Sequence, residues 1–179
     1  MLERRSGHLV FIASAAALIG LVGYSSYSPS KYALRGLADC LRNELLGTGV
    51  SVSLGYPPDT DTPGFATENI SKPAATTAIS EFFQDTVFKP EVVARAMFKG
   101  LQRGRYHLPN PDLVQSLLIS HCAGVTPKPM GALLEMLLAP LITLIVVVAR
   151  AIIDGIVHKH NTKALAARSQ PGADPGMTR

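Results

Sequence analysis

The sequence has little of what marks a secreted, fibrous or disordered protein. It contains no tryptophan and only two cysteines, Cys40 and Cys122, which lie far apart and form no CxxC pair. Two cysteines cannot build a disulfide framework for a chain of 179 residues, so we expect two free thiols in a reducing compartment. Charged residues make up only 17% of the chain and hydrophobic residues 47%, which excludes disorder over most of its length.

Clusters of one charge are also scarce. The net charge is +4 and the isoelectric point is about 9.2, but the basic residues are scattered, apart from Arg4-Arg5 and the C-terminal tail. No aromatic residues alternate with the basic ones, so binding to nucleic acid is not expected. The basic tail is better suited to contact with anionic lipids.

Apolar strands alternate with amphipathic helices in the first two thirds of the chain. Residues 8–14 and 50–54 are short apolar runs typical of buried parallel strands. Residues 24–46 carry leucines at spacings of three and four, which predicts a helix with one apolar face, and residues 89–102 predict another. A third short strand is expected at residues 105–108. This order of elements predicts an α/β fold.

Two other segments break this pattern. Residues 56–64 contain three prolines and are predicted to form a loop, and residues 65–88 are expected to be a mobile polar segment with one weak helix. Residues 111–158 form a hydrophobic helical segment, which we expect to be associated with a membrane because its most apolar part approaches the length of a spanning helix. The alternative is a helix packed on the domain or against a partner. Residues 159–179 are predicted to be a disordered tail.

Tyr27 and Lys31 form the pattern with the clearest chemical meaning. Their spacing of four residues puts a phenol and an ammonium group on one face of a helix, although two ordinary surface residues can show the same spacing. Ser14 ends the strand that precedes this helix, and the Pro57-Pro58 loop follows the next strand. In a parallel sheet, ligands bind beyond the carboxyl ends of the strands, so Ser14 and this loop are expected at one edge.

These residues together resemble the short-chain dehydrogenase/reductase family. The loop stands in the place of the family's PGxxxT segment, with Pro58 where the family usually has glycine. The resemblance implies that residues 1–110 are the C-terminal half of a Rossmann-like, doubly wound parallel sheet. It also implies that Ser14, Tyr27 and Lys31 are catalytic and that NADPH is held by Tyr27, Lys31, Pro57, Pro58, Thr60 and Thr62.

The implied reaction is the reduction of a ketone. The ketone oxygen gains negative charge as hydride arrives, so it needs a hydrogen-bond donor and a proton. By this resemblance, the Ser14 hydroxyl would bond to the carbonyl oxygen and Tyr27 would donate the proton. The Lys31 cation would favour the phenolate and would hold the nicotinamide ribose.

Residues 27–37 and 56–66 resemble the family members that reduce 3-oxosphinganine to sphinganine in sphingolipid biosynthesis. This implies a long-chain ketone lipid as substrate and a catalytic part that faces the cytosol at the endoplasmic reticulum membrane. One alternative is a reductase of another hydrophobic ketone, such as a steroid. Another is a non-catalytic, membrane-associated fragment that pairs with intact subunits. The resemblance also allows a homodimer, since the helix that contains Tyr27 commonly packs across a dimer interface in this family.

The dinucleotide-binding fingerprint of this family is not found in the chain. No GxxxGxG or GxGxxG turn stands between a strand and a helix, and no Asn-Asn-Ala-Gly segment is present. We therefore expect a truncated chain, with the first half of the sheet preceding residue 1 and one sheet edge exposed. No metal site is expected, because His158 and His160 lack a third ligand and the aspartates Asp59 and Asp61 suit a turn.

Overall fold

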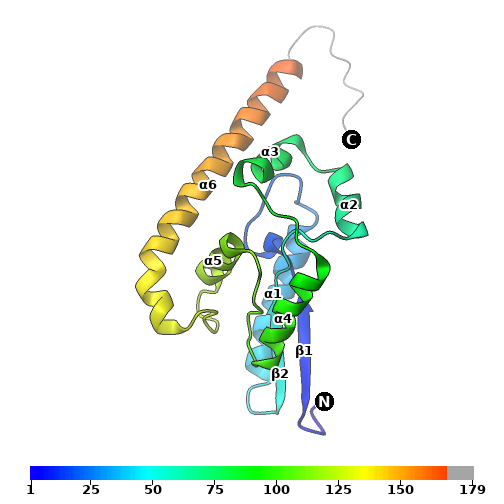
Figure 1. Cartoon of the computed structure of the whole chain (residues 1–179), viewed down its shortest axis with the longest axis vertical. Coiled ribbons are helices and arrows are strands. Elements are labelled where there is room, and N and C mark those ends of the chain that lie inside the picture. Colours follow the sequence, from blue (N-terminus) through cyan, green and yellow to red (C-terminus); the bar gives the residue numbers. More distant parts are fainter. Residues whose placement is uncertain (169–179) are drawn as a thin grey trace.

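The computed structural model describes residues 1–168 and has a small parallel sheet with helices on both of its faces (Figure 1). Strands β1 (Gly7–Ile12) and β2 (Val50–Gly55) pair in parallel, with Gly7 opposite Val50 and Ile12 opposite Gly55. The α/β fold with a parallel sheet is therefore confirmed. The short strand expected at residues 105–108 is reduced to a single parallel bridge, in which the Leu54 amide donates to the Tyr106 carbonyl at 2.7 Å.

Helix α1 (Ser28–Glu44) connects the two strands and packs on one face of the sheet. It begins four residues later than its predicted start at Tyr24, because Tyr24 to Tyr27 form a turn and Pro29 stands in the first helical turn. Before this turn, the short 3-10 helix η1 (Ala15–Ala17) follows β1 directly, and Ser14 caps it.

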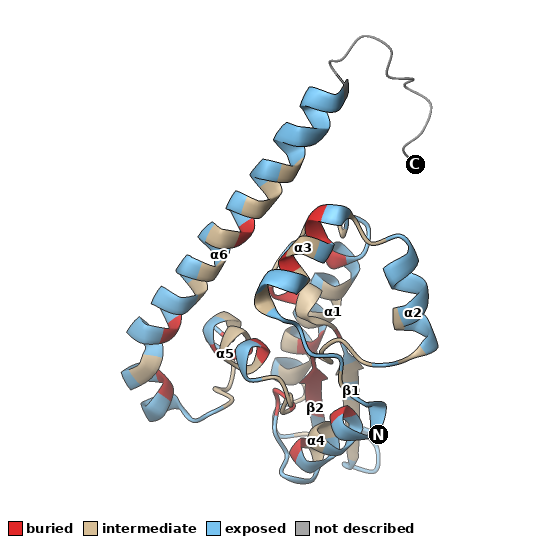
Figure 2. Cartoon of the chain, turned by 45° about the horizontal axis from the view of Figure 1, so that its top comes forward, coloured by how far each residue is buried: buried red, intermediate tan, exposed pale blue. Residues whose placement is uncertain are grey.

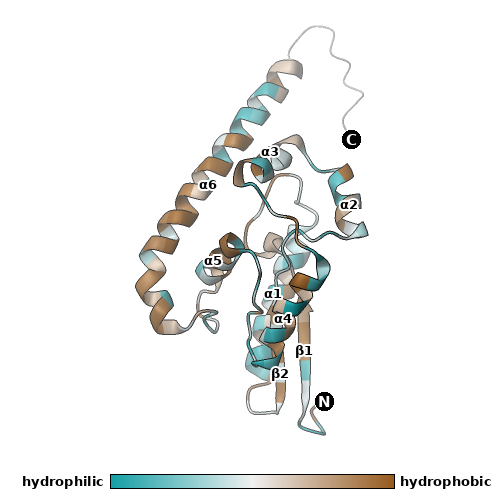
Figure 3. Ribbon diagram, viewed as in Figure 1, coloured by the Kyte–Doolittle hydropathy of each residue, from teal (hydrophilic) through white to brown (hydrophobic). Residues whose placement is uncertain are grey.

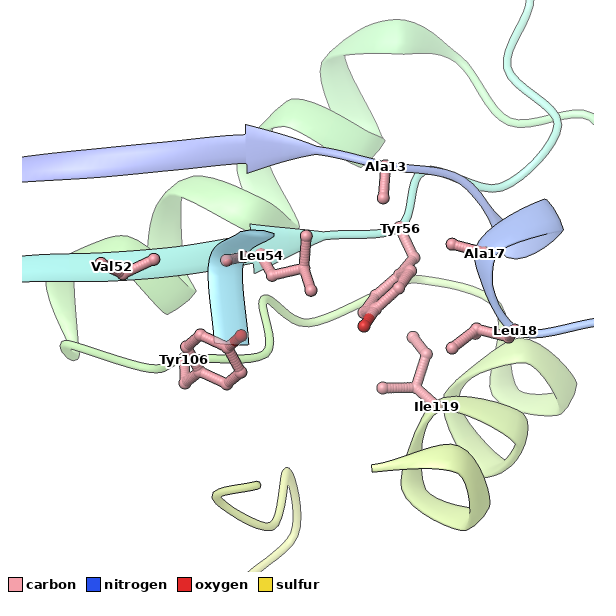
Figure 4. Packing of buried hydrophobic residues seen from close by; sticks show 9 residues of the cluster. Ala13, Ala17, Leu18, Val52, Leu54, Tyr56, Tyr106 and Ile119 are labelled. Atoms are coloured by element: carbon pink, nitrogen blue, oxygen red, sulfur yellow. The ribbon is translucent and has the colours of Figure 1, made fainter. Parts of the chain in front are cut away.

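The hydrophobic core lies between the sheet, α1 and helix α5 (Leu113–Cys122). Ala38 of α1 is fully buried against this cluster, because its small side chain lets the helix approach the strands closely. Figure 4 shows the side chains of Tyr56, Leu18 and Ile119 converging beyond the end of β2. The core therefore reaches past the strands and supports the loop that follows β2.

Helix α4 (Pro90–Gln102) lies on the opposite face of the sheet, next to the end of β2. Successive residues of a strand point to opposite faces, so Gly55 faces away from the core that contains Leu54. A Cβ atom at Gly55 would lie only 2.3 Å from the Cε atom of Met97, so glycine leaves the space that this methionine fills. The helix is positioned close to the end of β2 as a result.

Residues 65–88 were predicted to be a mobile polar segment with one weak helix. This prediction is wrong, because helices α2 and α3 occupy most of the segment. Helix α2 (Pro63–Ile70) is capped by Thr62, whose Oγ1 accepts a hydrogen bond from the Phe65 amide at 3.2 Å. Helix α3 (Ala74–Phe83) is tied to the segment after η1 by Thr76, whose hydroxyl donates to the Val22 carbonyl at 2.7 Å. A threonine cap and a buried threonine thus order a segment that has little hydrophobic periodicity.

Helix α6 (Ala132–Arg168) is a single long helix that lies along the edge of the molecule and contacts α3 and α5 (Figures 1 and 2). Pro140 lies inside it without ending it. The prediction of a disordered tail from Lys159 is wrong for residues 159–168, which continue the helix. The other residues of the predicted tail, 169–179, lie outside the described part of the chain.

Gly49, just before β2, provides a test of the close packing between the start of β2 and the backbone of Arg5 before β1. Its φ is +83°, and a Cβ atom there would lie 2.1 Å from the backbone carbonyl oxygen of Arg5. Gly47 has a φ of +80° but no atom within 4 Å of its Cβ position, so it serves as a matched control. Both alanine substitutions incur the left-handed backbone cost of about 1 kcal/mol, and only Gly49→Ala adds a backbone clash.

We expect Gly49→Ala to lower the free energy of unfolding by at least about 1 kcal/mol more than Gly47→Ala does, as measured by urea unfolding followed by circular dichroism. Equal losses in the two variants would show that the strand pair adjusts freely at Arg5.

Candidate active site

An open cavity of about 660 Å³ lies at the carboxyl ends of β1 and β2. Its walls come from the end of β1, the start of α1, the loop after β2, and helices α2 and α4. All of the site residues predicted from the sequence line this one cavity: Ser14, Tyr27, Lys31, Pro57, Pro58, Thr60 and Thr62. The parallel pairing of the strands explains this convergence, because it brings the segments after both strands to the same edge.

Ser14 lies two residues after the end of β1 and is fixed there as the cap of η1. Its backbone is extended, and its Oγ accepts a hydrogen bond from the Ala16 amide at 3.2 Å, which caps η1. This bond uses a lone pair of the hydroxyl and leaves its proton able to be donated to a ligand. Ser14 is therefore arranged as a hydrogen-bond donor on the wall of the cavity.

Tyr27 and Lys31 lie on the same side of the start of α1, as their spacing predicted. The Lys31 ammonium is 5.3 Å from the centre of the Tyr27 ring and donates to the Ile12 carbonyl at 3.4 Å. Tyr27 is 39% exposed, and its ring opens onto the cavity. The pair thus presents a phenolic proton with a cation beside it, next to the end of β1.

The loop after β2 is held in place from both sides. The Thr60 hydroxyl donates to the Pro58 carbonyl at 2.6 Å. The backbone of Phe88 forms two bonds with the loop, since its amide donates to Asp59 and its carbonyl accepts from Asp61, each at 2.9 Å. The hydroxyl of Thr60 is thus engaged within the loop. The Thr62 oxygen accepts the capping bond of α2, and its proton remains able to be donated.

Two further residues of the cavity, Tyr24 and Glu68, were not predicted from the sequence. The Tyr24 hydroxyl donates to Oε1 of Glu68 at 2.5 Å, and its ring centre lies 5.9 Å from that of Tyr27. Burial and the bond to Glu68 raise the pKa of Tyr24, so this hydroxyl keeps its proton. The two residues are far apart in the sequence, and Glu68 lies in the segment expected to be mobile, so only the fold could bring them together.

Asp59 adds a second carboxylate to the cavity wall. Burial raises its pKa above the ordinary value, while the nearby Lys72 acts in the opposite direction. A cluster of three metal-ligating side chains is not present among residues 1–168. Glu68 instead accepts a hydrogen bond from the Tyr24 hydroxyl, and Asp59 lies near Lys72.

Tyr56 and His107 stack against each other at the start of the Pro57-Pro58 loop. Tyr56 follows β2, and its ring stacks on His107 with ring centres 5.9 Å apart, while its carbonyl accepts from Asn110 Nδ2 at 2.7 Å. His107 Nε2 is bonded to the Thr126 hydroxyl at 2.8 Å. Burial, with a contribution from the nearby Arg35, lowers the pKa of His107 to about 4, so the ring is neutral at physiological pH.

Known proteins match this chain in its sequence. Residues 1–73 match the family model described as short chain dehydrogenase. The chain is 41% identical over 145 residues to a 3-ketodihydrosphingosine reductase of Dictyostelium discoideum, and this match covers 81% of the chain and 42% of that protein. It is 50% identical over 106 residues to a 3-dehydrosphinganine reductase of Danio rerio, covering 59% of the chain and 31% of the relative. The resemblance expected from the sequence is confirmed.

The chain spans about two fifths or less of the length of these relatives. Among solved structures, a short-chain dehydrogenase from Streptomyces avermitilis is similar with a TM-score of 0.48 and 22% identity, over 64% of this chain and 45% of that chain. A short chain dehydrogenase from Mycobacterium paratuberculosis bound to NAD has a TM-score of 0.48 and 20% identity, over 61% and 45% of the two chains.

The buried His107 makes the stability of this region depend on pH. Its pKa falls from 6.5 in the unfolded chain to about 4 in the folded one, so between these values only the unfolded chain binds the proton. The stabilisation is complete above pH 6.5 and is lost as the pH falls toward 4. The loss amounts to at most about 3 kcal/mol.

We expect His107→Gln to remove this part of the pH dependence between pH 6.5 and 4, as measured by urea unfolding at a series of pH values. The exposed His158 gives the control, because His158→Gln should keep the slope of the unmodified chain. If the free energy of unfolding depends on pH equally in His107→Gln and in the unmodified chain, His107 is not the group responsible.

Proposed function

We propose that this chain, whose residues 1–73 match the short chain dehydrogenase family, is the catalytic part of an NADPH-dependent reductase that converts 3-oxosphinganine into sphinganine. The observation that carries the proposal is the convergence of Ser14, Tyr27 and Lys31 in one cavity at the ends of the parallel strands. The names of the sequence relatives support the substrate. The activity is proposed for the whole protein, because the chain covers only part of those relatives.

The side chains of the cavity suit the protonation of a ketone that receives hydride. The Ser14 hydroxyl would donate a hydrogen bond to the carbonyl oxygen and keep the carbonyl carbon facing the cofactor. The Tyr27 phenol would transfer its proton to this oxygen as the negative charge develops. Lys31, beside the ring, stabilises the phenolate that is left behind. The carbonyl carbon gains a C–H bond and the oxygen an O–H bond, which completes a two-electron reduction.

The donors of the cavity fit the nicotinamide end of a dinucleotide cofactor. The Lys31 ammonium and the Thr62 hydroxyl suit ribose hydroxyl and carboxamide groups, and Pro57, Pro58 and Thr60 form the adjoining wall. When bound, the cofactor supplies the hydride. The described residues do not form a glycine-rich turn between a strand and a helix, so the pyrophosphate would need groups from outside them. The choice of NADPH over NADH is part of the proposal.

Two alternatives predict different results. A reductase of another hydrophobic ketone would act on a steroid and form no sphinganine in a panel of substrates. A non-catalytic chain would reduce neither substrate and would act by pairing with intact subunits. We also propose a homodimer through α1, on which Leu37 is 48% exposed.

The proposed acid is tested by Tyr27→Phe in the longest natural form of the protein. We expect this variant to reduce 3-oxosphinganine at least about 100-fold more slowly, because it lacks the transferable proton. Its binding of NADPH should be retained. Tyr32→Phe is the matched control, since Tyr32 lies on the same helix outside the cavity wall, and it should keep full activity. Turnover that persists in Tyr27→Phe would refute the role of Tyr27.

We further propose that α6 attaches the protein to a membrane. It is long and apolar enough to cross one (Figure 3), and only 11% of its most apolar part is buried. Leu144 and Val148 are 60% and 50% exposed. Arg150 and Asp154 form an ion pair at 3.0 Å where the apolar stretch ends. The resemblance to sphingolipid reductases favours the endoplasmic reticulum, with the cavity on the cytosolic side.

Flotation with phosphatidylcholine vesicles tests this attachment. Leu144→Asp combined with Val148→Asp should abolish co-flotation, because each carboxylate at the centre of an inserted helix costs roughly 3 kcal/mol. The exposed His158 and Asn161 carry the matched control, in which aspartate at both positions should leave flotation intact. If the first variant floats as the unmodified chain does while its circular dichroism is unchanged, α6 packs on protein instead.

A further inference from the structure

The proton transfer proposed above uses neither carboxylate of the cavity, and of the two Asp59 has Lys72 nearby. Glu68 lines the cavity from α2, and only its Oε1 accepts a bond, from Tyr24. Within residues 1–168 it forms no ion pair at 4.0 Å or less. Lys31, the cation of the catalytic pair, is directed to Tyr27 and Ile12 instead. The second oxygen of Glu68 therefore offers a negative charge to a ligand.

The position of Glu68 is fixed relative to the proposed proton donor. Tyr24 holds the carboxylate through its hydroxyl, and its ring lies against that of Tyr27 at 5.9 Å. The raised pKa of Tyr24 keeps this hydroxyl a donor, so the bond persists across the physiological range. The Glu68 carboxylate is therefore linked through Tyr24 to the ring of Tyr27, the proposed proton donor.

The substrate class of the proposed function has a complementary charge. 3-Oxosphinganine carries an ammonium group on the carbon next to its carbonyl carbon. A carbonyl oxygen bound by Ser14 and Tyr27 places this ammonium in the same cavity as Glu68. Charge-assisted hydrogen bonds between an ammonium and a carboxylate are among the stronger polar contacts in proteins. The apolar side chains of Phe65, Val93 and Met97 line other parts of the cavity and suit an alkyl chain.

We propose that Glu68, oriented by Tyr24, binds the ammonium group of the substrate and so selects 2-amino ketones over ketones that lack the amine. This rests on the proposed function and names the specificity-determining residue of its site. Glu68 takes no part in the proton transfer.

Two substitutions separate the effect of the negative charge of Glu68 from the effect of the position of its carboxylate. Glu68→Gln keeps an oxygen that can accept from Tyr24 and removes only the charge. Tyr24→Phe keeps the charge and removes the bond that orients it. Glu81→Gln is the control, because Glu81 is an exposed carboxylate on α3 outside the cavity wall.

The kinetic test compares 3-oxosphinganine with 1-hydroxyoctadecan-3-one, which has the same chain without the amine. In the longest natural form of the protein, Glu68→Gln should lower the ratio of the two kcat/KM values at least about tenfold, mainly through the KM of the amino ketone. Tyr24→Phe should lower this ratio less, and Glu81→Gln should leave it unchanged. Equal losses on both ketones in Glu68→Gln would mean a structural tie and overturn the proposal.

A binding measurement separates this proposal from the proposed reaction. Without turnover, the unmodified protein in detergent should bind radiolabelled sphinganine at least about tenfold more tightly than octadecane-1,3-diol, and Glu68→Gln should bind both equally. A protein that shows this preference but reduces neither ketone would contradict the proposed reaction and support the role of Glu68. A protein that reduces 3-oxosphinganine but shows no preference for the amine would support the proposed reaction and contradict the role of Glu68.

Discussion

The parallel pairing of β1 with β2 is the constraint on which the rest of the structure depends. Because both strands run in the same direction, Ser14 and the Pro57-Pro58 loop emerge at one edge, although they are far apart in the sequence. The connection between the strands has to cross back over the sheet, and α1 provides this return. The start of α1 then brings Tyr27 and Lys31 to the same edge. The site follows from strand direction and from the close packing of Ala38 on the sheet.

The sequence was sufficient to predict what local patterns and spacing encode. Strands β1 and β2 and helices α1 and α4 follow from short apolar runs and from apolar stripes at helical spacing. The site roles of Ser14, Tyr27 and Lys31 were instead implied by the family resemblance. Helices α2 and α3 were missed because a threonine cap and a buried threonine order them, and neither produces an apolar periodicity. The end of α6 was missed because a polar composition was taken to mean disorder, whereas a helix already nucleated by its apolar part continues at little cost.

Tyr24 and Glu68 mark the limit of sequence reasoning in the site. Neither residue was predicted for the site, and their contact depends on how α2 is placed after the loop. The placement of α2 depends in turn on the bonds between that loop and Phe88. The residues proposed for the chemistry could therefore be recognised in the sequence, whereas the residue proposed for selectivity could be identified only from the tertiary structure.

The two backbone bonds between Phe88 and the loop close the base of the segment that contains α2 and α3. This segment leaves the sheet and returns to it at nearly one point, so changes in its length or sequence need not displace β2 or α4. The segment with α2 and α3 can therefore vary while the sheet, α1 and α4 keep their positions. Selection for a different lipid could replace this segment and Glu68 with it, while Ser14, Tyr27 and Lys31 stay where they are.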